Sequence, residues 1–522
     1  MRHWFAAPVL FVAAFGVDGC APKKIEAPPP PPPKLGPIEA PEDVVAEVLV
    51  RDPQALLDTV AQASGMKNLD PATLLSDPEL AEFAQVADLH GTAAMAVLGD
   101  PRKSESWHFA AAVRLRDPKA ARARFNEAVG KGKLKATQSP AIRSKIYQEG
   151  KSSMALIGEA LVFADAAETI ESAGRWIGKE TDGTPPHEAS LHVPLARWAG
   201  MLKGEAKRWV DAEVQKDPDS AGLEPLMRTF VDVVGNLGDV RLALDFEKED
   251  AVLDFHLGAT GAFSSWLGKY PAGTPRSILT LPRGSGAFVV RFPDAVSSVV
   301  QSLFEGEAKK PSAKKELDDV RILGRSIGHE VAVVYAEKSK PGEAPKATEA
   351  MVRIELVDPK GARAAIKSLI ADWTGKPDRK ITRSPWARAG ADGESIQVVD
   401  GADKYDARWA IKGNHLFVDV AWDGKVTLVD AAVDPNAKSL LSNDPRAKSF
   451  ADKLPKDGLV LAYYAQTSKA PKLEELGAIP ALTGIRWGWA SASKDGVASA
   501  WNVPLADLAT YLTKGGDKKP EP

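Results

Sequence analysis

Hydrophobic residues form two kinds of pattern along the chain, which are short apolar runs typical of strands and apolar residues at the three-to-four spacing of a helix. Asp-Pro dipeptides mark several of the changes from the first pattern to the second. Apolar runs at 109–115 and 351–356 are followed by Asp117-Pro118 and Asp358-Pro359. Aspartate caps a helix N-terminus by accepting a backbone N–H, and proline suits the first helical position because no donor is needed there. After the second dipeptide, apolar residues recur every three or four positions up to Gly375, which indicates an amphipathic helix. The pattern predicts strands that lead directly into helices.

Glycine-containing turns divide other apolar runs into pairs. Gly158-Glu159 interrupts MALIGEALVF, Gly413-Asn414 interrupts WAIKGNHLFV, and Asp495-Gly496 marks a third turn. Glycine at the first central position suits a type II′ turn between antiparallel strands. Hairpins together with short strand-to-helix connections predict an α+β fold, in which each half has an antiparallel or mixed sheet with helices packed on one face.

Short motifs that recur at a nearly constant offset predict two homologous halves. DPKAAR at 117–122 matches DPKGAR at 358–363 with an offset of 241. SPAIR at 139–143 matches SPWAR at 384–388 with an offset of 245. Two further short matches keep offsets of 240 and 245. Several matches in register are typical of an internal duplication.

The chain divides into five predicted parts. They are a signal peptide at 1–19, a lipidated proline-rich linker at 20–40, a first α+β half at 41–272, a second at 280–514, and a disordered tail at 515–522. Prolines and glycines between the halves punctuate the boundary, because both residue types favour turns and loops.

The two predicted halves differ in the length of one connection. Leu191 and Arg241 are 50 positions apart, whereas the matching Leu459 and Arg486 are 27 apart. The extra segment carries an apolar stripe at helical spacing. The stripe consists of Leu223, Leu226, Met227, Phe230, Val231 and Val234. Core packing accounts for such a stripe, and so does a lid or a partner surface, since connecting segments often carry function.

The first twenty residues combine an export signal with the only cysteine of the chain. Arg2 precedes an apolar stretch of fourteen residues, and Asp18-Gly19-Cys20 follows it. Such a helix spans about 21 Å, less than the roughly 30 Å of bilayer hydrocarbon, which favours a removable signal. The segment resembles the lipobox of bacterial lipoproteins, although Asp18 stands where a small or apolar residue is usual. The resemblance implies cleavage before Cys20, a diacylglycerol thioether on its sulfur, and an acyl chain on its new amine. A plain secretory signal with an incidental cysteine is the alternative.

The residues after Cys20 predict a spacer and a location. Six consecutive prolines at 28–33 favour a stiff polyproline II segment that holds the body tens of ångströms from the lipid. A ligand for an SH3-type domain is the alternative. Ala21 follows the cysteine, and by resemblance to enterobacterial sorting it implies the outer membrane, with the body in the periplasm. The body also resembles uncharacterised families of exported bacterial proteins with tandem strand–Asp-Pro–helix units, a resemblance that carries no catalytic motif.

Composition narrows the classes of function. The net charge of −3 and the isoelectric point near 6.3 argue against a nucleic-acid partner, which requires a basic surface. A single cysteine excludes intramolecular disulfides, thiolate zinc sites and iron–sulfur clusters. We therefore predict no cofactor. The apolar content of 44% is ordinary for a protein with a globular core.

One motif suggests nucleophilic chemistry. Residues 324–328 read G-R-S-I-G and fit the nucleophile elbow, in which a strand precedes the serine and a helix follows it. Here HEVAVVYA at 329–336 predicts a strand after Ser326, so the context is reversed. A glycine-flanked turn is the simpler interpretation, and a serine hydrolase using Ser326 with a histidine such as His329 is the alternative.

Other partial motifs fail in their spacing. Ser312 and Lys315 fit S-x-x-K but lie in a charged stretch, and the segment at 150–152 lacks the earlier glycine of a P-loop. His187 and His192 are five positions apart, not four, so they leave the common helix face that a zincin site needs. The sequence assigns no catalytic, cofactor-binding or metal-binding residue, and one lipidation residue, Cys20.

Together these patterns predict a non-catalytic binding or scaffold protein anchored by lipid in the cell envelope. The membrane is one expected partner, through the anchor, and an unidentified envelope protein or ligand is the other. Two alternatives stay open, which are the hydrolase using Ser326 and a carrier of hydrophobic cargo.

Overall fold

The computed structural model describes most of the chain beyond its first segment. The described residues are 38–64, 86–150, 152–216, 224–247, 250–268, 273–291, 314–338, 346–374, 380–400, 403–422, 425–456, 459–465 and 486–505. The predicted signal peptide, Cys20, most of the linker and the predicted tail lie outside them. The chain forms two compact units. The first comprises Met1–Leu202, Gly238–His256 and Pro504–Pro522, and the second comprises Lys203–Leu237 and Leu257–Val503.

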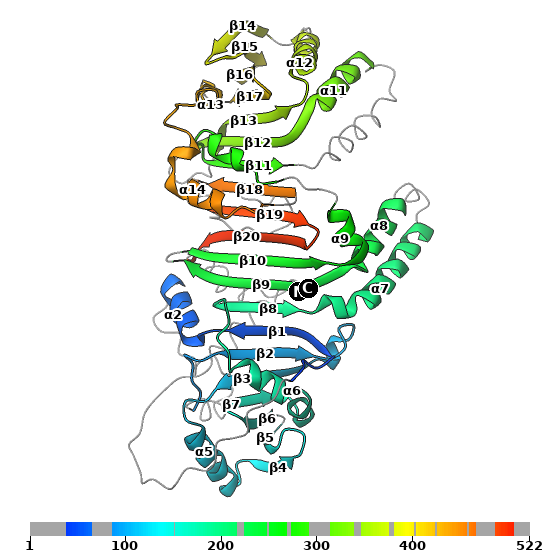
Figure 1. The fold of residues 1–522 in the computed structure, drawn as a ribbon, viewed down its shortest axis with the longest axis vertical. Helices are drawn as coiled ribbons and strands as arrows, with labels where there is room; N and C mark the ends of the chain where they lie inside the picture. Colours follow the sequence, from blue (N-terminus) through cyan, green and yellow to red (C-terminus); the bar gives the residue numbers. More distant parts are fainter. Residues whose placement is uncertain are drawn as a thin grey trace. The chain divides into compact units, whose positions relative to one another are not determined.

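The first unit is built on antiparallel strands, drawn in Figure 1 in blue to green. The pairing order is β9-β8-β1-β2-β3-β7-β6-β5-β4, and β9 also pairs with β10. Their bounds are β1 Val44–Val50, β2 Ala93–Leu98, β3 His108–Arg114, β4 Lys135–Ser139, β5 Ser144–Glu149, β6 Ser152–Ile157, β7 Ala160–Ala164, β8 Ala189–Val193, β9 Leu237–Glu247 and β10 Asp250–Ala259. The helices are α2 Pro53–Ser64, η1 Ser104–Ser106, α5 Pro118–Gly130 and α6 Ala167–Glu180.

Helices cover both faces of this sheet. On one face, Met95 of β2 packs in the same core as Leu56 of α2 and the fully buried Phe125 of α5. Ala94 and Ala96 on the other face pack against α6 through Ile170 and Ile177. Every residue of β2 is buried, and strands covered on both sides have continuous apolar runs, not alternating ones.

The second unit repeats the same order of pairing. Its antiparallel strands run β19-β18-β11-β12-β13-β17-β16-β15-β14, and β19 also pairs with β20. Their bounds are β11 Gly286–Arg291, β12 Ile327–Lys338, β13 Lys346–Leu356, β14 Lys380–Arg388, β15 Ala391–Asp400, β16 Asp403–Lys412, β17 His415–Ala421, β18 Leu459–Ala465, β19 Trp487–Ser493 and β20 Gly496–Pro504. Each strand corresponds to the strand of the first unit whose number is ten lower.

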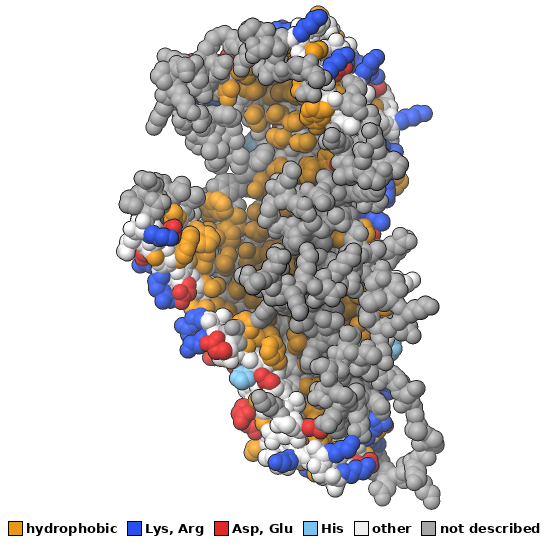
Figure 2. All heavy atoms as spheres, turned by 180° about the vertical axis from the view of Figure 1, so that it is seen from behind, with side chains coloured by type: hydrophobic (Ala, Val, Ile, Leu, Met, Phe, Trp, Pro, Cys, Tyr) orange, Lys and Arg blue, Asp and Glu red, His pale blue; other side chains and the backbone are white. Residues whose placement is uncertain are grey.

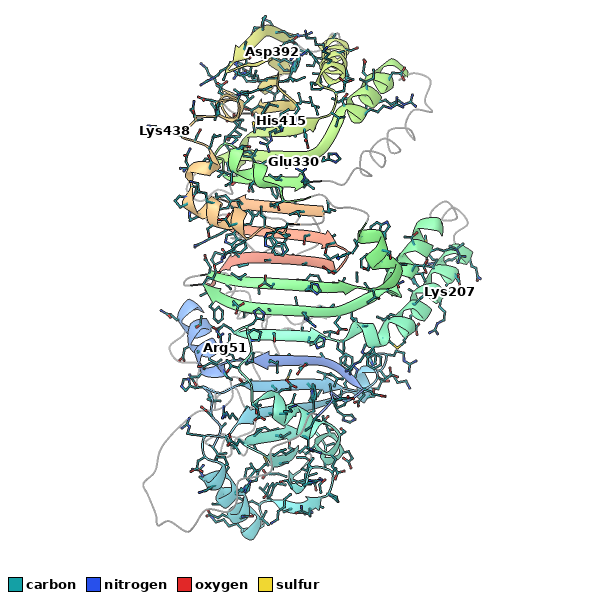
Figure 3. The ribbon with its side chains drawn as sticks, viewed as in Figure 1. Arg51, Lys207, Glu330, Asp392, His415 and Lys438 are labelled. Atoms are coloured by element: carbon teal, nitrogen blue, oxygen red, sulfur yellow. The ribbon has the colours of Figure 1, made fainter. Side chains whose placement is uncertain are left out.

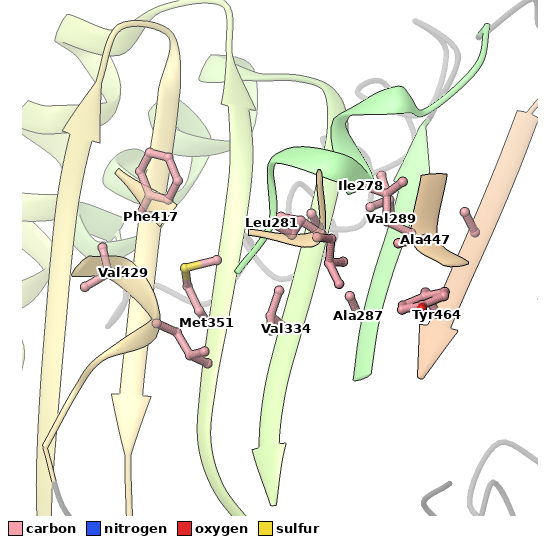
Figure 4. Packing of buried hydrophobic residues seen from close by; sticks show 14 of the residues in the cluster. Ile278, Leu281, Ala287, Val289, Val334, Met351, Phe417, Val429, Ala447 and Tyr464 are labelled. Atoms are coloured by element: carbon pink, nitrogen blue, oxygen red, sulfur yellow. The ribbon is translucent and has the colours of Figure 1, made fainter. Parts of the chain in front are cut away.

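The second unit also has covered faces on both sides of its strands. The helices are α7 Leu195–Lys216, which begins in the first unit, α8 Glu224–Val234, α9 Gly261–Leu267, η3 Arg276–Thr280, α11 Lys314–Ser326, α12 Pro359–Thr374, α13 Leu428–Ala432, η5 Leu441–Asn443 and α14 Pro445–Asp452. On one face, Ile366 of α12 packs against Trp409 and Leu416. On the other, α13, α14, η3 and η5 cover a core that includes Met351 and Phe417 (Figure 4).

The local predictions of helix starts and turns are confirmed. Asp117 accepts hydrogen bonds from the amides at the start of α5, and α12 begins at Pro359. Gly158 and Gly413 lie between β6 and β7 and between β16 and β17, each with a positive φ that a two-residue turn of this kind requires.

The predicted fold class is wrong. The described strands belong to a single antiparallel sheet of twenty strands, not to two halves with separate sheets, and helices lie on both sheet faces in each unit, not on one. The physical reason is that period and turn chemistry specify strands and helices locally, whereas the partner of an edge strand depends on contacts far apart in the sequence. What recurs along the chain is the order of strand pairing.

Candidate functional site

The extra segment between β8 and β9 forms two helices, α7 and α8. Its predicted apolar stripe divides between the core and the solvent, because Val231 is buried whereas the adjacent Phe230 is exposed. Leu223 lies outside the described residues. Core packing therefore accounts for only part of the stripe, and Phe230 needs another explanation.

Three large aromatic side chains on α7, α8 and α9 face solvent. Trp209 is 55% exposed, Phe230 is 52% exposed and Trp266 is 46% exposed. Their neighbours Val210 and Phe263 are buried, so each helix has an inner face and an outer aromatic residue. We call Trp209, Phe230 and Trp266 the aromatic triad. Large exposed aromatic side chains are often found where a protein meets a partner.

Hydrogen bonds join the three helices to one another and to the sheet. Lys203 of α7 donates to the Asp232 carboxylate of α8 at 2.9 Å. The side-chain oxygen of Asn236, just after α8, accepts the amide of Ala262 at the start of α9 at 3.3 Å. Ser264 of α9 donates to the Lys494 carbonyl in the turn between β19 and β20 at 2.6 Å. The triad is therefore carried by a connected group of helices in the second unit.

Charges of both signs lie on these helices. Where the structure describes the side chains of these helices from position 203 onward, five are basic and four are acidic. They are Lys203, Lys207, Arg208, Lys216 and Arg228, against Glu205, Asp211, Glu213 and Asp232. Lys207 is labelled on α7 in Figure 3, and Figure 2 shows hydrophobic side chains beside lysine and arginine side chains over these helices. These helices therefore carry exposed aromatic side chains and charges of both signs, with a single basic side chain in excess.

Ser326 does not occupy a nucleophile elbow. It is the last residue of α11, and β12 begins at the next residue, so the helix precedes the serine and the strand follows it. The side chain is buried, and its hydroxyl donates to the Ile322 carbonyl within the same helix at 2.7 Å. His329 uses its backbone amide to donate to Glu355 at 3.2 Å. Residues 324–328 are therefore a junction from helix to strand, which is neither the predicted glycine-flanked turn nor the strand–serine–helix context that the hydrolase alternative needs.

The histidines of the partial zincin motif have separate partners, and only His192 lies in β8, whereas His187 precedes that strand. His187 lies 2.7 Å from Asp245, whereas His192 lies 3.1 Å from Asp239 and 3.8 Å from Glu47. The Glu47 carboxylate, followed by that of Asp239, raises the pKa of His192.

Metal ligation finds no support in this region. Glu188 forms an ion pair with Arg51. Throughout the part of the chain that the structure describes, no group of three or more histidine, cysteine or acidic side chains could hold a metal ion.

The other singled-out residues have structural surroundings. Gly150 lies in the turn between β5 and β6, Lys315 lies in α11, and Ser312 is outside the described residues. Trp487 packs against Phe450 of α14, with ring centroids 5.5 Å apart, and Lys453 lies 4.7 Å above its ring. The ring of Trp487 therefore contributes to the packing of α14 against the sheet.

Sequence reasoning missed a group of buried charges in the second unit. Glu330 of β12 and Arg353 of β13 form an ion pair at 3.0 Å, with side chains only 7% and 6% exposed. Arg353 also donates to Thr280 at 2.5 Å, and burial lowers its pKa while Glu330 opposes that effect. At the offset of 241, the first unit has Ala112 where the second has Arg353. The available sequence signal was the pair Arg353 and Glu355, which are charged residues at alternate positions of a predicted apolar run and therefore share one face of the strand.

Comparison with known proteins identifies no family. No protein-family model matches the chain, and no curated protein matches it. Similar solved structures include three crystal forms of TP0453. Form III has a TM-score of 0.23 at 9% identity, covering 43% of this chain and 82% of that one. Form IV has 0.22 at 8%, with 41% and 76% covered, and form I has 0.24 at 9%, with 43% and 81% covered. A likeness this weak supports no argument about function.

None of the helices that the structure describes is both long enough and apolar enough to cross a lipid bilayer.

Proposed function

We propose that this protein is a lipid-anchored protein of the cell envelope that binds a partner protein and catalyses no reaction. The anchor is assigned to Cys20, at the end of the apolar signal. Two or three acyl chains hold a protein at a bilayer durably, because each buried methylene contributes about 0.8 kcal/mol. The twenty-one residues at 20–40 span roughly 65 Å if extended as polyproline II, which leaves the body free to reach a partner. By the sorting resemblance of Ala21, the membrane is the outer membrane and the body lies in the periplasm.

The aromatic triad is the observation that carries the binding role. Trp209, Phe230 and Trp266 are exposed on helices that are hydrogen-bonded together. Tryptophan and arginine are enriched among the residues that dominate protein interfaces, and Arg208 lies next to Trp209 in an ion pair with Glu205. Burying one such ring at an interface removes apolar surface worth about 2 kcal/mol.

A partner protein explains this surface better than an anionic bilayer does. Binding to anionic lipid requires an excess of basic side chains beside the apolar ones. Among the described side chains of these helices from position 203 onward, basic ones exceed acidic ones by only one. Nearly balanced charges with exposed rings fit the rim and the anchor residues of a protein–protein interface.

Photo-cross-linking tests the binding role. A benzoylphenylalanine replaces Trp209 or Phe230 in separate cell-produced variants, and Trp422 is the matched control because it is a similarly exposed aromatic residue outside the triad. We expect the same discrete protein adduct from 209 and 230, and none from 422. A second substitution, Trp266→Ser, should weaken both adducts. Equal labelling from all three positions, or labelling of lipid alone, contradicts the proposal.

The anchor is tested separately. Cys20→Ser should release the protein from the membrane fraction and remove the acyl mass from the N-terminal peptide, whereas Ala21→Ser should leave both unchanged. Unaltered fractionation of Cys20→Ser contradicts the anchor but not the binding surface. The hydrophobic-carrier alternative stays a prediction from the sequence.

A further inference from the structure

Two carboxylates meet inside the second unit where α13 lies over the sheet. Glu349 is on β13 and Asp419 is on β17, and Asp419 lies opposite Met351, two positions from Glu349. Residues at such diagonal positions project from the same sheet face within reach of each other. Both side chains are buried, and Asp419 has no exposed surface.

The hydrogen-bond donors around the two carboxylates are divided unequally. Glu349 accepts from the Thr427 amide, from the Thr427 hydroxyl at 2.8 Å and from the Leu428 amide at 2.7 Å. Asp419 accepts only from the Val429 amide, at 2.8 Å through Oδ2. Its Oδ1 is buried with no hydrogen-bond partner in the described structure. Donors stabilise the charged form of an acid, so the arrangement favours the carboxylate on Glu349 and the neutral acid on Asp419.

The charged groups that face Asp419 leave an excess of acids. Arg408 lies opposite it on β16 and is shared, because it also binds Asp430 of α13 and Ser395 of β15. Arg388 of β14 is 3.5 Å from Asp430. Asp406 of β16 lies opposite Ala421 on the same face. Lys412 of β16 donates to the Val433 carbonyl at the end of the same segment at 2.6 Å. Four acids, Glu349, Asp406, Asp419 and Asp430, therefore face three basic side chains, and one proton balances the excess negative charge.

We propose that Glu349 and Asp419 share one proton, and that this proton latches the segment 427–433 onto the sheet of the second unit. The Oδ1–H of Asp419 donates to Glu349, which satisfies the oxygen that otherwise lacks a partner. Burial, and then the Glu349 charge, raises the pKa of Asp419 to about 8. The latch is therefore closed at neutral pH, when an ordinary aspartate is ionised.

Loss of the proton has a defined structural consequence. Two buried anions would repel each other, and each is held by amides of the same segment. That segment supplies Leu428, Val429 and Val433 to the core beside Met351 and Phe417 (Figure 4). Opening would expose these side chains, so the proton controls whether an apolar segment is available on the surface.

The sign of the pH dependence follows from linkage. The open segment exposes Asp419, whose pKa there returns toward 3.8, whereas the closed form has the raised value. Between these two pKa values the closed form binds more protons than the open form. The equilibrium constant for opening therefore rises by up to tenfold for each pH unit. Above the raised value both forms are ionised, and the dependence levels off.

Hydrogen exchange of the intact protein tests the latch. The protection factors of the Leu428 and Val429 amides should fall about tenfold per pH unit from pH 6 to pH 8 in the wild type. Asp419→Asn keeps a donor toward Glu349 and should remove this slope. Asp430→Asn, in the same segment, is the matched control and should retain it. A flat wild-type profile, or an Asp419→Asn profile with the wild-type slope, overturns the proposal.

A second measurement needs no stable variant. Infrared spectroscopy of wild-type protein with ¹³C-labelled aspartate should show a protonated carboxyl band at pH 7 that disappears as the pH rises above 8. Absence of that band at pH 7 also overturns the proposal.

Discussion

Removal of one member of the buried Glu330–Arg353 pair should destabilise the second unit strongly. In Arg353→Met, the apolar stem of the side chain is kept and the charge is lost. Glu330 then stays buried, with a hydrogen bond from Ser277 and a more distant contact to Arg291 at 3.6 Å. Breaking a buried pair in this way costs about 3–5 kcal/mol.

The structure places the expected loss near the lower end of that range. Arg291 is about one-third exposed and compensates part of the uncovered charge of Glu330. The lost bonds from Arg353 to Thr280 and to the Ser277 carbonyl each contribute about 1 kcal/mol. We therefore expect a loss of about 3 kcal/mol in the free energy of opening, which is roughly a hundredfold rise in exchange rate at the most protected amides.

Native-state hydrogen exchange of peptides from β12 and β13 measures this loss in the unit concerned. The double variant Glu330→Leu, Arg353→Met should recover most of it, because replacement of both charges by apolar groups is close to neutral. Arg102→Met is the control, since Arg102 and Asp100 form an exposed pair that solvent screens and that contributes little to stability. The reasoning is refuted if Arg353→Met costs no more than this control, or if the double variant is as unstable as the single one.

Three further changes are expected to have distinct effects. Phe125→Ala should lower the free energy of unfolding of the first unit by about 3–5 kcal/mol, because Phe125 is fully buried and its ring centroid lies 4.7 Å from that of Tyr147. A loss of less than about 1 kcal/mol in a urea or thermal unfolding experiment would contradict the assigned packing. Asp117→Ala should lower the stability of the start of α5 by about 1 kcal/mol, since the Asp117 side chain accepts hydrogen bonds from two backbone amides there. Hydrogen exchange at those amides measures the loss, and Asp117→Asn should retain most of the stability. The pKa of His192 is raised above 6.5, first by Glu47 and then by Asp239, so the stabilising effect of the charged ring is fully present below pH 6.5 and is lost as the pH rises through the raised value. The difference in free energy of unfolding between wild type and His192→Gln should therefore shrink from pH 6 to pH 8.5. A constant difference would exclude the ion pair as its source.

The candidate site was only partly accessible to sequence reasoning. The longer connection between β8 and β9 and its helical stripe were visible, and they led to the region that carries Phe230. Trp209 and Trp266 were not singled out, because an aromatic residue on a helix is as often core as surface. The buried acids Glu349 and Asp419 were missed because they lie on different strands, and the sequence does not show that these strands pair.

The amino-acid sequence by itself determined the local elements. Asp117 and Pro118 specify a helix start, and Gly158 and Gly413 specify turns, because these effects depend on the backbone preferences and hydrogen bonds of a few adjacent residues. The tertiary structure alone decided which strands pair, that helices cover both sheet faces, and that Glu349 and Asp419 adjoin. Those outcomes depend on surfaces brought together from distant parts of the chain, and the burial that makes them favourable exists only once the partners have met.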